Sequence, residues 1–416
     1  MLDIKYLKEN LAEVKKALSK KHTKFNLEKV IALYDKKQVL LQKVEKLRAR
    51  QNQFSRAGNP SRQRRAEAGK IKNEIKNQEL KYKKADEQYK IEAILLHNIP
   101  DKSVPKKEQG NKIEKKWGRP RKFDFKIKDH EQLGRDLDII DAERAAKVSG
   151  ARFGYLKNEA VQLQFVLINY LFEKLTKKGF VLILPPVLVK ERAMFGTGFF
   201  PTEKVEYYKT ESDDMYLAGT AEVPLCAYHR DEILDGADLP KKYAGFSTCF
   251  RREAGTYGKD TKGIFRLHQF DKVEMFVFCQ PQDSWKIFDQ LVKINEEIFQ
   301  ELKLPYQLVN ISGGELGAPN AKKIDAEVWF PSQKKYRELT SCSNDTDFQA
   351  RRLNIKYRTT NNKQQTTNFV HTVNDTALAM GRTIAAIIEN HQQEDGSIRV
   401  PKVLQKYFRA KIIKKG

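Results

Sequence analysis

Arginines flank a glycine-rich loop in the second half of the chain. Residues 249–253 (CFRRE) precede the loop 255–263, and residues 265–270 (FRLHQF) follow it. Two strands with arginines at both ends of a connecting loop suit a polyphosphate, because the guanidinium group is planar and always charged. Phe270 offers an aromatic face to a purine. The alternative is an ordinary hairpin with arginines on its surface.

A second polar segment, residues 337–343 (RELTSCS), alternates a carboxylate and hydroxyls with apolar residues. In a regular strand Glu338, Thr340 and Cys342 face one way, and Leu339 and Ser341 face the other. A glutamate and a nearby hydroxyl are suitable oxygen ligands for Mg²⁺, which also takes phosphate oxygens. Taken alone the pattern is weak, since hydroxyl-rich strands are common.

Two more carboxylates lie within apolar runs, Glu222 in residues 220–222 (TAE) and Glu274 in residues 272–274 (KVE). A buried carboxylate needs a cationic partner, and either a substrate ammonium group or an internal salt bridge would serve. Further on, Arg382 follows Gly381 at the start of a predicted helix. An arginine there adds to the helix dipole, and together they attract phosphate.

The first hundred residues predict a helical arm. Apolar residues recur at alternating steps of three and four from Val30 to Phe54 and from Ile71 to Leu96, on either side of a Gly-Asn-Pro breaker at 58–60. This spacing predicts an antiparallel two-helix coiled coil with a thin seam. The side chains that we expect to bind RNA are basic and lie towards the turn: Arg48, Arg50, Arg56, Arg62, Arg64, Arg65 and Lys70. Ordinary solvated coiled-coil faces are the alternative.

The rest of the chain predicts a linker over residues 101–125 and a catalytic domain over 126–416, after an N-terminal domain over 1–100. Short apolar runs with hairpin-length connections favour an α+β fold, an antiparallel sheet flanked by helices. The predicted strands are 180–184 (buried, and ended by two prolines), 215–218, 243–250, 265–278, 306–311, 327–330 and 369–373. The predicted helices are 161–174, 284–302 and 376–390.

Composition narrows the class of protein. The 416 residues carry a formal net charge of +24, which favours a polyanionic partner such as nucleic acid over an ordinary basic surface. The sequence contains neither a membrane-spanning segment nor a signal peptide. Four cysteines without metal-ligand spacing predict a reduced, cytoplasmic protein and no zinc site.

The order of these segments resembles that of bacterial seryl-tRNA synthetases nearly end to end. The resemblance includes the arm, residues 148–153 (VSGARF), TAEVPL from Thr220, FRREAG from Phe250, RLHQFDKVE from Arg266, RELTSCSN from Arg337 and the Gly381-Arg382 pair. It implies a class II synthetase fold, with motif one ending at Pro185 or Pro186. It also implies a homodimeric ligase that converts L-serine and ATP into seryl-adenylate and esterifies the 3′ end of tRNA(Ser), leaving tRNA(Sec) open.

The resemblance also assigns site residues. For serine they are Thr220, Ala221, Glu222, Arg251, Glu274 and Thr376, with the last two around the serine hydroxyl. For ATP they are Arg251, Arg252, Glu253, Arg266, Phe270, Glu338, Leu339, Thr340, Ser341 and Arg382. Glu338 and Ser341 would hold Mg²⁺, and the basic arm would bind the long variable arm of the tRNA.

Three positions depart from the family pattern. Asp375 stands where glycine is usual and would place a charge near the serine pocket. Asp345 and the linker residues 104–107 are also atypical, but we expect neither to touch an assigned residue. Rival interpretations are a non-catalytic relative, which would lose site residues, a carrier-protein ligase, which would lack the arm, and a synthetase for another amino acid.

Overall fold

The structure is a computed structural model that describes residues 2–21, 24–56, 62–254, 263–361, 364–408 and 410–415. Its contacts divide the chain into two compact units. The first comprises residues 1–19 and 23–99, and the second comprises residues 20–22 and 100–416. No helix in the described part of the chain is long and apolar enough to cross a membrane.

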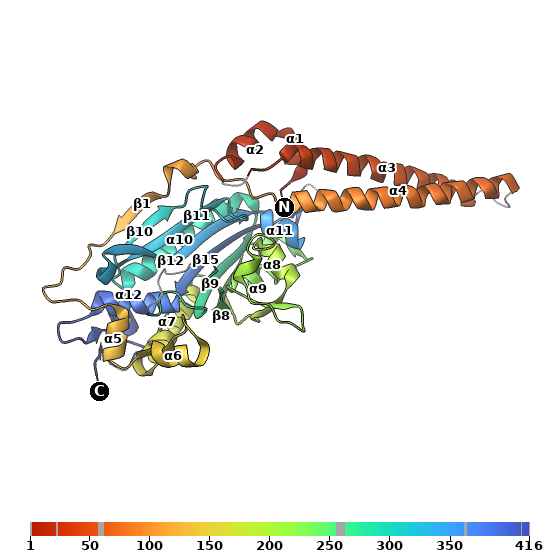
Figure 1. Ribbon diagram of the computed structural model, residues 1–416. Helices are drawn as coiled ribbons and strands as arrows, with labels where there is room; N and C mark the ends of the chain where they lie inside the picture. The colour runs from red at the N-terminus through yellow and green to blue at the C-terminus, as the bar shows by residue number, and fades with distance from the viewer. Residues whose placement is uncertain are drawn as a thin grey trace. The chain divides into compact units, whose positions relative to one another are not determined.

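Figure 1 labels the helices and the larger strands. The helices are α1 (Ile4–Glu9), α2 (Leu11–Leu18), α3 (Leu27–Arg56), α4 (Arg62–Ile94), α5 (His130–Asp136), α6 (Ala142–Ser149), α7 (Asn158–Lys177), α8 (Glu191–Thr197), α9 (Glu222–Ala227), α10 (Ser284–Glu301), α11 (Phe348–Leu353) and α12 (Met380–His391). The strands are β1 (Lys112–Trp117), β2 (Ile140–Asp141), β3 (Tyr155–Leu156), β4 (Val181–Ile183), β5 (Leu188–Lys190), β6 (Met215–Leu217), β7 (Ile233–Asp235), β8 (Lys241–Phe250), β9 (Gln269–Cys279), β10 (Tyr306–Asn310), β11 (Lys322–Phe330), β12 (Lys335–Thr346), β13 (Lys356–Asn361), β14 (Gln364–Phe369), β15 (His371–Ala379), β16 (Ile398–Arg399) and β17 (Ile412–Ile413).

The first unit is built on the predicted hairpin, because α3 and α4 pack along their lengths as two long antiparallel helices (Figure 1). Val44, Ile71 and Ile75 are buried in the seam, as the heptad spacing predicts. At the base, Lys37 interrupts the apolar seam and forms an ion pair with Asp86 at 2.6 Å. Apolar residues of α1 and α2 complete a small core there with both long helices.

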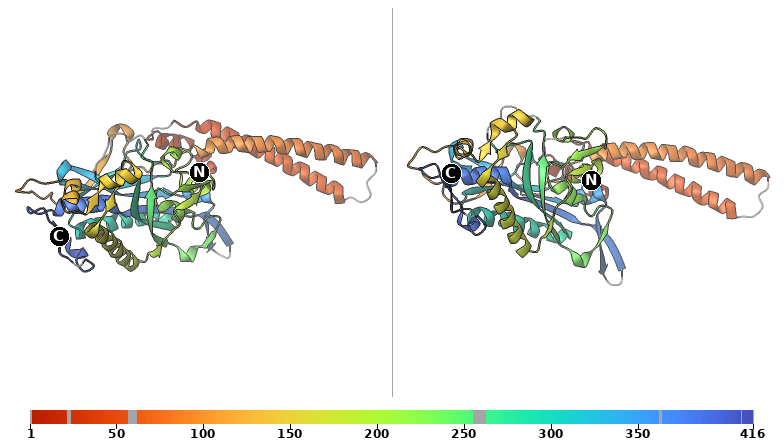
Figure 2. Two further views of the ribbon diagram at one scale, coloured as in Figure 1. Left: turned by 60° about the horizontal axis from the view of Figure 1, so that its bottom comes forward. Right: turned by 90° about the horizontal axis from the view of Figure 1, so that it is seen from below.

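The second unit is centred on an eight-stranded sheet with the order β1-β10-β11-β12-β15-β9-β8-β4 (Figures 1 and 2). All neighbouring strands pair antiparallel except β4 and β8, which are parallel. The antiparallel sheet expected from short connections is therefore confirmed. Its first strand, β1, comes from the segment that composition predicts as a linker, and pairs with β10.

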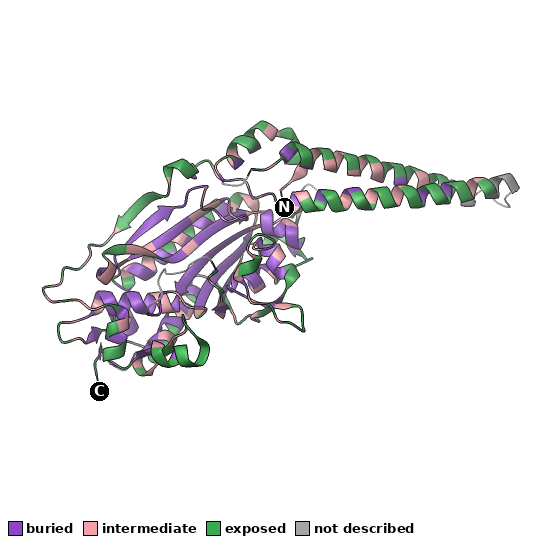
Figure 3. Ribbon diagram, viewed as in Figure 1, coloured by how far each residue is buried: buried purple, intermediate pink, exposed green. Residues whose placement is uncertain are grey.

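Alternation along β9 shows how the two faces of the sheet differ. Val273, Met275 and Val277 belong to the large core that includes α7, α10 and α12. Phe276 and Phe278 point to the other face, into a smaller core with α9 and α11. The burial pattern of Figure 3 follows this arrangement, since the central strands and α12 are mostly buried. The smaller core leaves part of the second face open, and the candidate site lies there.

One strand prediction and one helix prediction need correction. Residues 180–184 were expected to form a buried strand, but Leu182 is 41% exposed and Leu184 is 79% exposed. Their strand, β4, is the last of the sheet and pairs only with β8, so an apolar run here marks an open edge. The helix expected over 376–390 starts at Met380, because Thr376 pairs with Glu274 and keeps β15 extended.

Candidate active site

A cavity of about 310 Å³ opens on this second face of the sheet. It is large enough for a small ligand. It brings together most of the predicted site residues: Thr220, Glu222, Arg251, Glu253, Arg266, Phe270, Glu274, Glu338, Leu339, Ser341, Thr376 and Arg382. Of the other predicted residues, Ala221 is fully buried and Arg252 lies beside the ring of Tyr208. Neither they nor Thr340 line the cavity.

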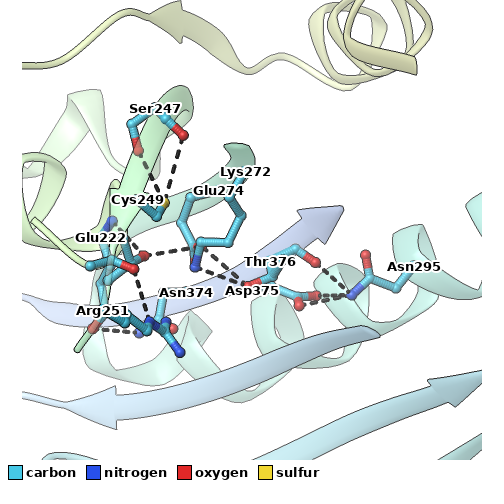
Figure 4. A network of polar contacts seen from close by, with 12 residues as sticks. Glu222, Ser247, Cys249, Arg251, Lys272, Glu274, Asn295, Asn374, Asp375 and Thr376 are labelled. Atoms are coloured by element: carbon cyan, nitrogen blue, oxygen red, sulfur yellow. Dashed lines mark hydrogen bonds and ion pairs between the residues drawn. The ribbon is translucent and has the colours of Figure 1, made fainter. Parts of the chain in front are cut away.

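One end of the cavity holds a network of hydroxyls around a carboxylate (Figure 4). The pairing of β9 with β15 sets Glu274 opposite Thr376. The hydroxyls of Thr376 and Thr220 donate to Glu274 Oε2 at 3.3 and 3.4 Å. Lys272 Nζ forms an ion pair with the same carboxylate and donates to Thr376 Oγ1 at 3.2 Å. Such a network fits a ligand that carries its own hydroxyl.

Lys272 is a residue of this site that sequence reasoning did not assign. It lies two positions before Glu274 on β9, so both side chains emerge on the same face of the sheet. That spacing is visible in the sequence and was the available signal. Its ammonium group pairs with the Glu274 carboxylate inside a buried setting, where an unpaired carboxylate would be costly.

Glu222 provides a second carboxylate at this end and is the first residue of α9. Gln349 Nε2 donates to it at 2.9 Å, and Asn374 Nδ2 donates at 3.4 Å. Burial, followed by the charges of Asp345 and Glu274, raises the pKa of Glu222 to about 8. A cationic group brought beside Glu222 would relieve these costs, so the site favours a ligand with an ammonium group.

The other end of the cavity is rich in guanidinium groups. Arg382 Nη1 donates to Glu338 O at 2.9 Å, and its Nε donates to Phe265 O at 3.3 Å. Arg266 pairs with Glu253 at 2.5 Å. Backbone and carboxylate partners fix the direction of these side chains before any ligand arrives. Fixed arginines on one wall are suited to a polyphosphate.

Arg251 lies between the two ends of the cavity. Its Nε donates to Gly219 O at 3.1 Å, and its guanidinium carbon is 5.5 Å from the centre of the Phe270 ring. Glu253, two residues later, has a φ of 51°, in the left-handed region that non-glycine residues rarely adopt. The first described residue after the connecting loop is Gly263, and residues 255–262 lie outside the described part of the chain.

A bulge in β12 changes the predicted arrangement of residues 338–342. The register with β11 shifts between Thr340 and Glu338, because Thr340 pairs with Ala326 and Glu338 pairs with Glu327. Glu338 and Ser341 therefore both line the cavity. Thr340 lies on the opposite face, where it accepts a hydrogen bond from Asn295 at 2.9 Å. The expectation that Glu338 and Thr340 face the same way is wrong, since it assumed a regular strand.

The pair formed by Glu338 and Ser341 fits a magnesium ion. Burial alone would raise the pKa of Glu338, but the nearby charges of Arg382 and Lys323 lower it, so the carboxylate stays ionised. Mg²⁺ takes one or two carboxylates and completes its shell with water and phosphate oxygens. The described residues hold no cluster of three or more His, Cys, Asp or Glu side chains that could bind a metal by themselves. This donor set therefore suits an ion that shares its ligands with a phosphate.

Asp375, the first departure from the family pattern, faces away from the cavity. Asn295 Nδ2 of α10 donates to both of its carboxylate oxygens at 2.8 Å, from the opposite face of the sheet (Figure 4). Burial, followed by the charge of Glu274, raises the pKa of Asp375 well above its usual range. The expected charge beside the serine pocket is therefore not there, because the side chains of adjacent strand residues point to opposite faces.

Asp345, the second departure, reaches the site after all. It accepts hydrogen bonds from Asn320 at 2.8 Å and from Asn374 at 3.0 Å. Asn374 lines the cavity and also donates to Glu222, so Asp345 helps to orient a neighbour of that carboxylate. Asp345 was expected to have no contact with an assigned residue. It does act on one of them, Glu222, but indirectly, through Asn374.

The basic residues predicted for RNA binding lie on the first unit. Arg48 and Arg50 form ion pairs with Glu79 and Glu67 at 2.6 and 2.7 Å on an exposed surface. Lys70 is exposed. The side chains of the other predicted residues, Arg56, Arg62, Arg64 and Arg65, lie outside the described part of the chain.

Comparisons with known proteins agree with this arrangement. The family described as "Seryl-tRNA synthetase N-terminal domain" matches residues 1–100, and "tRNA synthetase class II core domain (G, H, P, S and T)" matches residues 204–391. The serine–tRNA ligase of Symbiobacterium thermophilum is 41% identical over 424 residues, and that of Caldicellulosiruptor saccharolyticus is 44% identical over 424 residues. Both alignments cover 100% of this chain and 100% of the relative.

A solved structure extends the likeness to the fold. The crystal structure of seryl-tRNA synthetase from Pyrococcus horikoshii complexed with ATP matches with a TM-score of 0.92 and 40% sequence identity, and the match covers 100% of both chains. The fold class and activity that the motifs predict are thereby confirmed. With full-length relatives above 40% identity and both family domains present, this chain belongs to the seryl-tRNA synthetases, the class II ligases that join serine to tRNA.

Proposed function

We propose that the cavity binds L-serine at its carboxylate end and ATP at its arginine end, and that seryl-adenylate forms where the two meet. The observation that carries this proposal is the joint presence, in one cavity, of the Glu274–Thr376 pair and of Arg382 with Arg266. Glu222 and Thr220 receive the serine ammonium group. Glu274 and Thr376 close around its hydroxyl.

The first step needs no nucleophile from the protein. A serine carboxylate oxygen attacks the α-phosphorus, a new C–O–P bond forms, and the bond to the β-phosphate breaks to release diphosphate. Arg251 contacts both the serine carboxylate and the α-phosphate, while Arg266 and Arg382 hold the outer phosphates. Negative charge develops on the phosphates in the transition state. Positively charged side chains that are already in position there supply most of the rate acceleration.

The adenine ring binds between Phe270 and Arg382, and Glu253 recognises its edge. Glu338 and Ser341 would hold Mg²⁺, which offsets charge on the phosphates when bound. The support for this assignment is the ionised state of Glu338 and the bulge that aligns it with Ser341. Thr340 can contribute to ATP binding only through its backbone, because its side chain accepts a hydrogen bond from Asn295 on the other face of the sheet.

In the second step a ribose hydroxyl at the 3′ end of the tRNA attacks the adenylate carbonyl and AMP leaves. We propose tRNA(Ser) as the acceptor, bound through the basic arm, with tRNA(Sec) a substrate in any cell that makes it. The four cysteines are free and buried, which supports a protein that works in the reducing cytoplasm.

Serine is expected to be the one strong substrate in ATP–pyrophosphate exchange among the twenty amino acids. Alanine lacks the hydroxyl, so Glu274 and Thr376 would be left with unpaired polar atoms at a cost on the order of a few kcal/mol. The exchange rate with each amino acid, measured at equal concentration, tests this.

Two matched variants sharpen the result. Thr376→Ser keeps the hydroxyl and should preserve the preference for serine over alanine, whereas Thr376→Ala should reduce it. Alanine exchange within tenfold of serine in the unmodified protein would show that these residues do not select the substrate.

We also propose that two copies of the chain form a dimer through the open edge of the sheet. Val181, Leu182 and Leu184 are 58%, 41% and 79% exposed, and Phe165 of the adjoining helix α7 is 57% exposed. A contiguous apolar edge on a single copy is an aggregation hazard unless another surface covers it. A second copy that presents the same edge would bury it symmetrically.

Leu184→Glu is therefore expected to raise the dimer dissociation constant about a hundredfold or more, because the interface would bury an unpaired charge. Val148→Glu is the matched control, since Val148 is 69% exposed on α6 and lies outside this edge. Sedimentation velocity over a range of protein concentrations measures the dimer dissociation constant of each variant. The proposal is wrong if the unmodified chain is monomeric at micromolar concentration or if both variants dimerise equally.

A further inference from the structure

A second cleft, of about 640 Å³, lies at the opposite end of α12 from the active site. Residues from four separate segments line it: 119–121, 303–305, 390–393 and 399–405. Its cationic members are Arg119, Arg121, Lys303, Arg399 and Lys402. Its other lining residues are uncharged apart from His391, which titrates.

The sequence brings these segments together through a close backbone approach. Gly118 has a φ of 75°, and a Cβ there would lie only 3.2 Å from Pro305 Cα. A glycine at this position lets the chain pass directly over Pro305 after β1 and delivers Arg119 and Arg121 to the cleft. Arg121 Nη1 donates to Gln392 O at 2.9 Å, which ties this segment to the end of α12.

The charge of the cleft is uncompensated. Among the described residues, none of Arg119, Lys303, Arg399 and Lys402 forms an ion pair, although all are exposed. Elsewhere in this unit several exposed lysines have carboxylate partners, as Lys204 has in Glu191 and Lys406 has in Glu173. Burial, followed by the charges of Arg121 and Arg399, lowers the pKa of His391 at the cleft wall. The cleft is therefore a concentrated positive field without an internal counter-charge.

The cleft is separate from the active site. Gly381 and Arg382 line the active-site cavity, whereas Asn390 and His391 line the cleft. Asn390 lies eight positions after Arg382 in the helix, which corresponds to about 12 Å along the axis. Figure 1 shows the chain descending from β1 towards α5, beside α12. None of the described residues lines both sites.

We propose that this cleft binds the phosphodiester backbone of an RNA strand, as a contact site additional to the active site. Arginine and lysine side chains on an open surface hold phosphates without reading bases. The cations are exposed and spread over four segments of the chain. That extended layout favours a polymer over a small anion, which would be enclosed by buried donors.

The inference rests on the proposed function only in taking tRNA as the macromolecular substrate. A triple variant, Arg119→Gln, Arg399→Gln and Lys402→Gln, tests it and leaves Arg121 to hold the segment in place. We expect the affinity for tRNA(Ser) to fall about tenfold or more at low salt. The slope of log affinity against log salt should become shallower by about two to three, because each of the three lost phosphate contacts removes about 0.7 to 0.9.

The control variant removes the same charge elsewhere in the unit. Lys147→Gln, Lys190→Gln and Lys286→Gln replace exposed lysines on α6, β5 and α10 and should leave affinity and slope nearly unchanged. Serine-dependent pyrophosphate exchange, which needs no RNA, should be equal in both variants and in the unmodified chain. Failure of that exchange in the unmodified chain would contradict the proposed function and not the cleft.

Two outcomes would overturn the inference. The first is a cleft variant whose tRNA affinity and salt slope match those of the control. The second is a cleft variant that loses pyrophosphate exchange while the control retains it, since the cleft would then act on the active site.

Inorganic tripolyphosphate, added as a competitor of tRNA binding, tests whether the cleft prefers a polymer or a small anion. If it displaces tRNA from the unmodified chain no better than an equal ionic strength of sodium chloride does, the preference for a polymer is upheld. Specific displacement at micromolar concentration would reverse that preference.

Discussion

Arg382→Ala is expected to slow serine-dependent ATP–pyrophosphate exchange by about a hundredfold or more. The guanidinium of Arg382 is already oriented by its hydrogen bonds to Glu338 O and Phe265 O, so in the proposed function it would contact the outer phosphates without reorganisation. Negative charge builds up on the departing diphosphate, and a prefixed cation stabilises it most in the transition state. Single-turnover and steady-state exchange rates at saturating serine and ATP measure the loss.

Two companion variants separate chemistry from folding. Arg382→Lys keeps the positive charge but lacks the planar pair of donors. Its exchange rate should lie between that of the unmodified chain and that of Arg382→Ala. Arg135→Ala removes an exposed arginine that pairs only with Glu131, four residues earlier, and should have no effect on exchange. Thermal unfolding should be similar for all of them. An Arg382→Ala enzyme within a few-fold of normal activity would mean that this residue does not contact the phosphates.

Deleting residues 40–84 and joining the ends by a short turn is expected to reduce the charging of tRNA(Ser) by orders of magnitude while sparing pyrophosphate exchange. The deleted part holds most of the basic residues of the hairpin and none of the cavity residues. The cut falls just beyond the ion pair of Lys37 with Asp86, so the small core at the base keeps its packing. We expect a basic helical pair to recognise RNA mainly by its backbone and shape.

Comparison of the two reactions on one preparation shows which unit each depends on. Aminoacylation at several salt concentrations should also show a flatter salt dependence of tRNA binding in the deletion variant, since phosphate contacts are lost. Loss of exchange in a deletion variant that is still folded would assign the hairpin to the catalytic unit. An unchanged rate of tRNA charging would show that the hairpin has a structural role and does not bind the tRNA.

Local spacing in the sequence was enough to predict the elements that pack against their immediate neighbours. The heptad steps through Val44 and Ile75 predict the hairpin, because each helix needs only the other to bury its seam. The shared role of Glu274 and Thr376 around a serine hydroxyl came from the family resemblance, and the structure sets the two residues opposite each other where β9 pairs with β15. The Gly381-Arg382 pair lies in the first turn of α12, which starts at Met380 and not at residue 376, where the predicted helix began.

Contacts between segments far apart in the chain could not be predicted from the local spacing of residues. The bulge that turns Glu338 and Ser341 to one side depends on the register with β11, which no local pattern encodes. The path from Asp345 through Asn374 to Glu222 joins segments more than a hundred residues apart. The exposed edge at β4 has the composition of a buried strand, and in the proposed dimer a second copy would cover it.

The burial of all four native cysteines makes this enzyme a convenient subject for fluorescence labelling. Cys226, Cys249, Cys279 and Cys342 are buried, and burial raises the pKa of each thiol, so little reactive thiolate forms at neutral pH. A cysteine introduced at an exposed position, such as Lys70 of the hairpin, would react with a maleimide dye far faster than the native thiols. Dyes could thus be attached at chosen points without first removing cysteines from the sheet, and the motion of the hairpin during a charging cycle followed by energy transfer in the unmodified catalytic background.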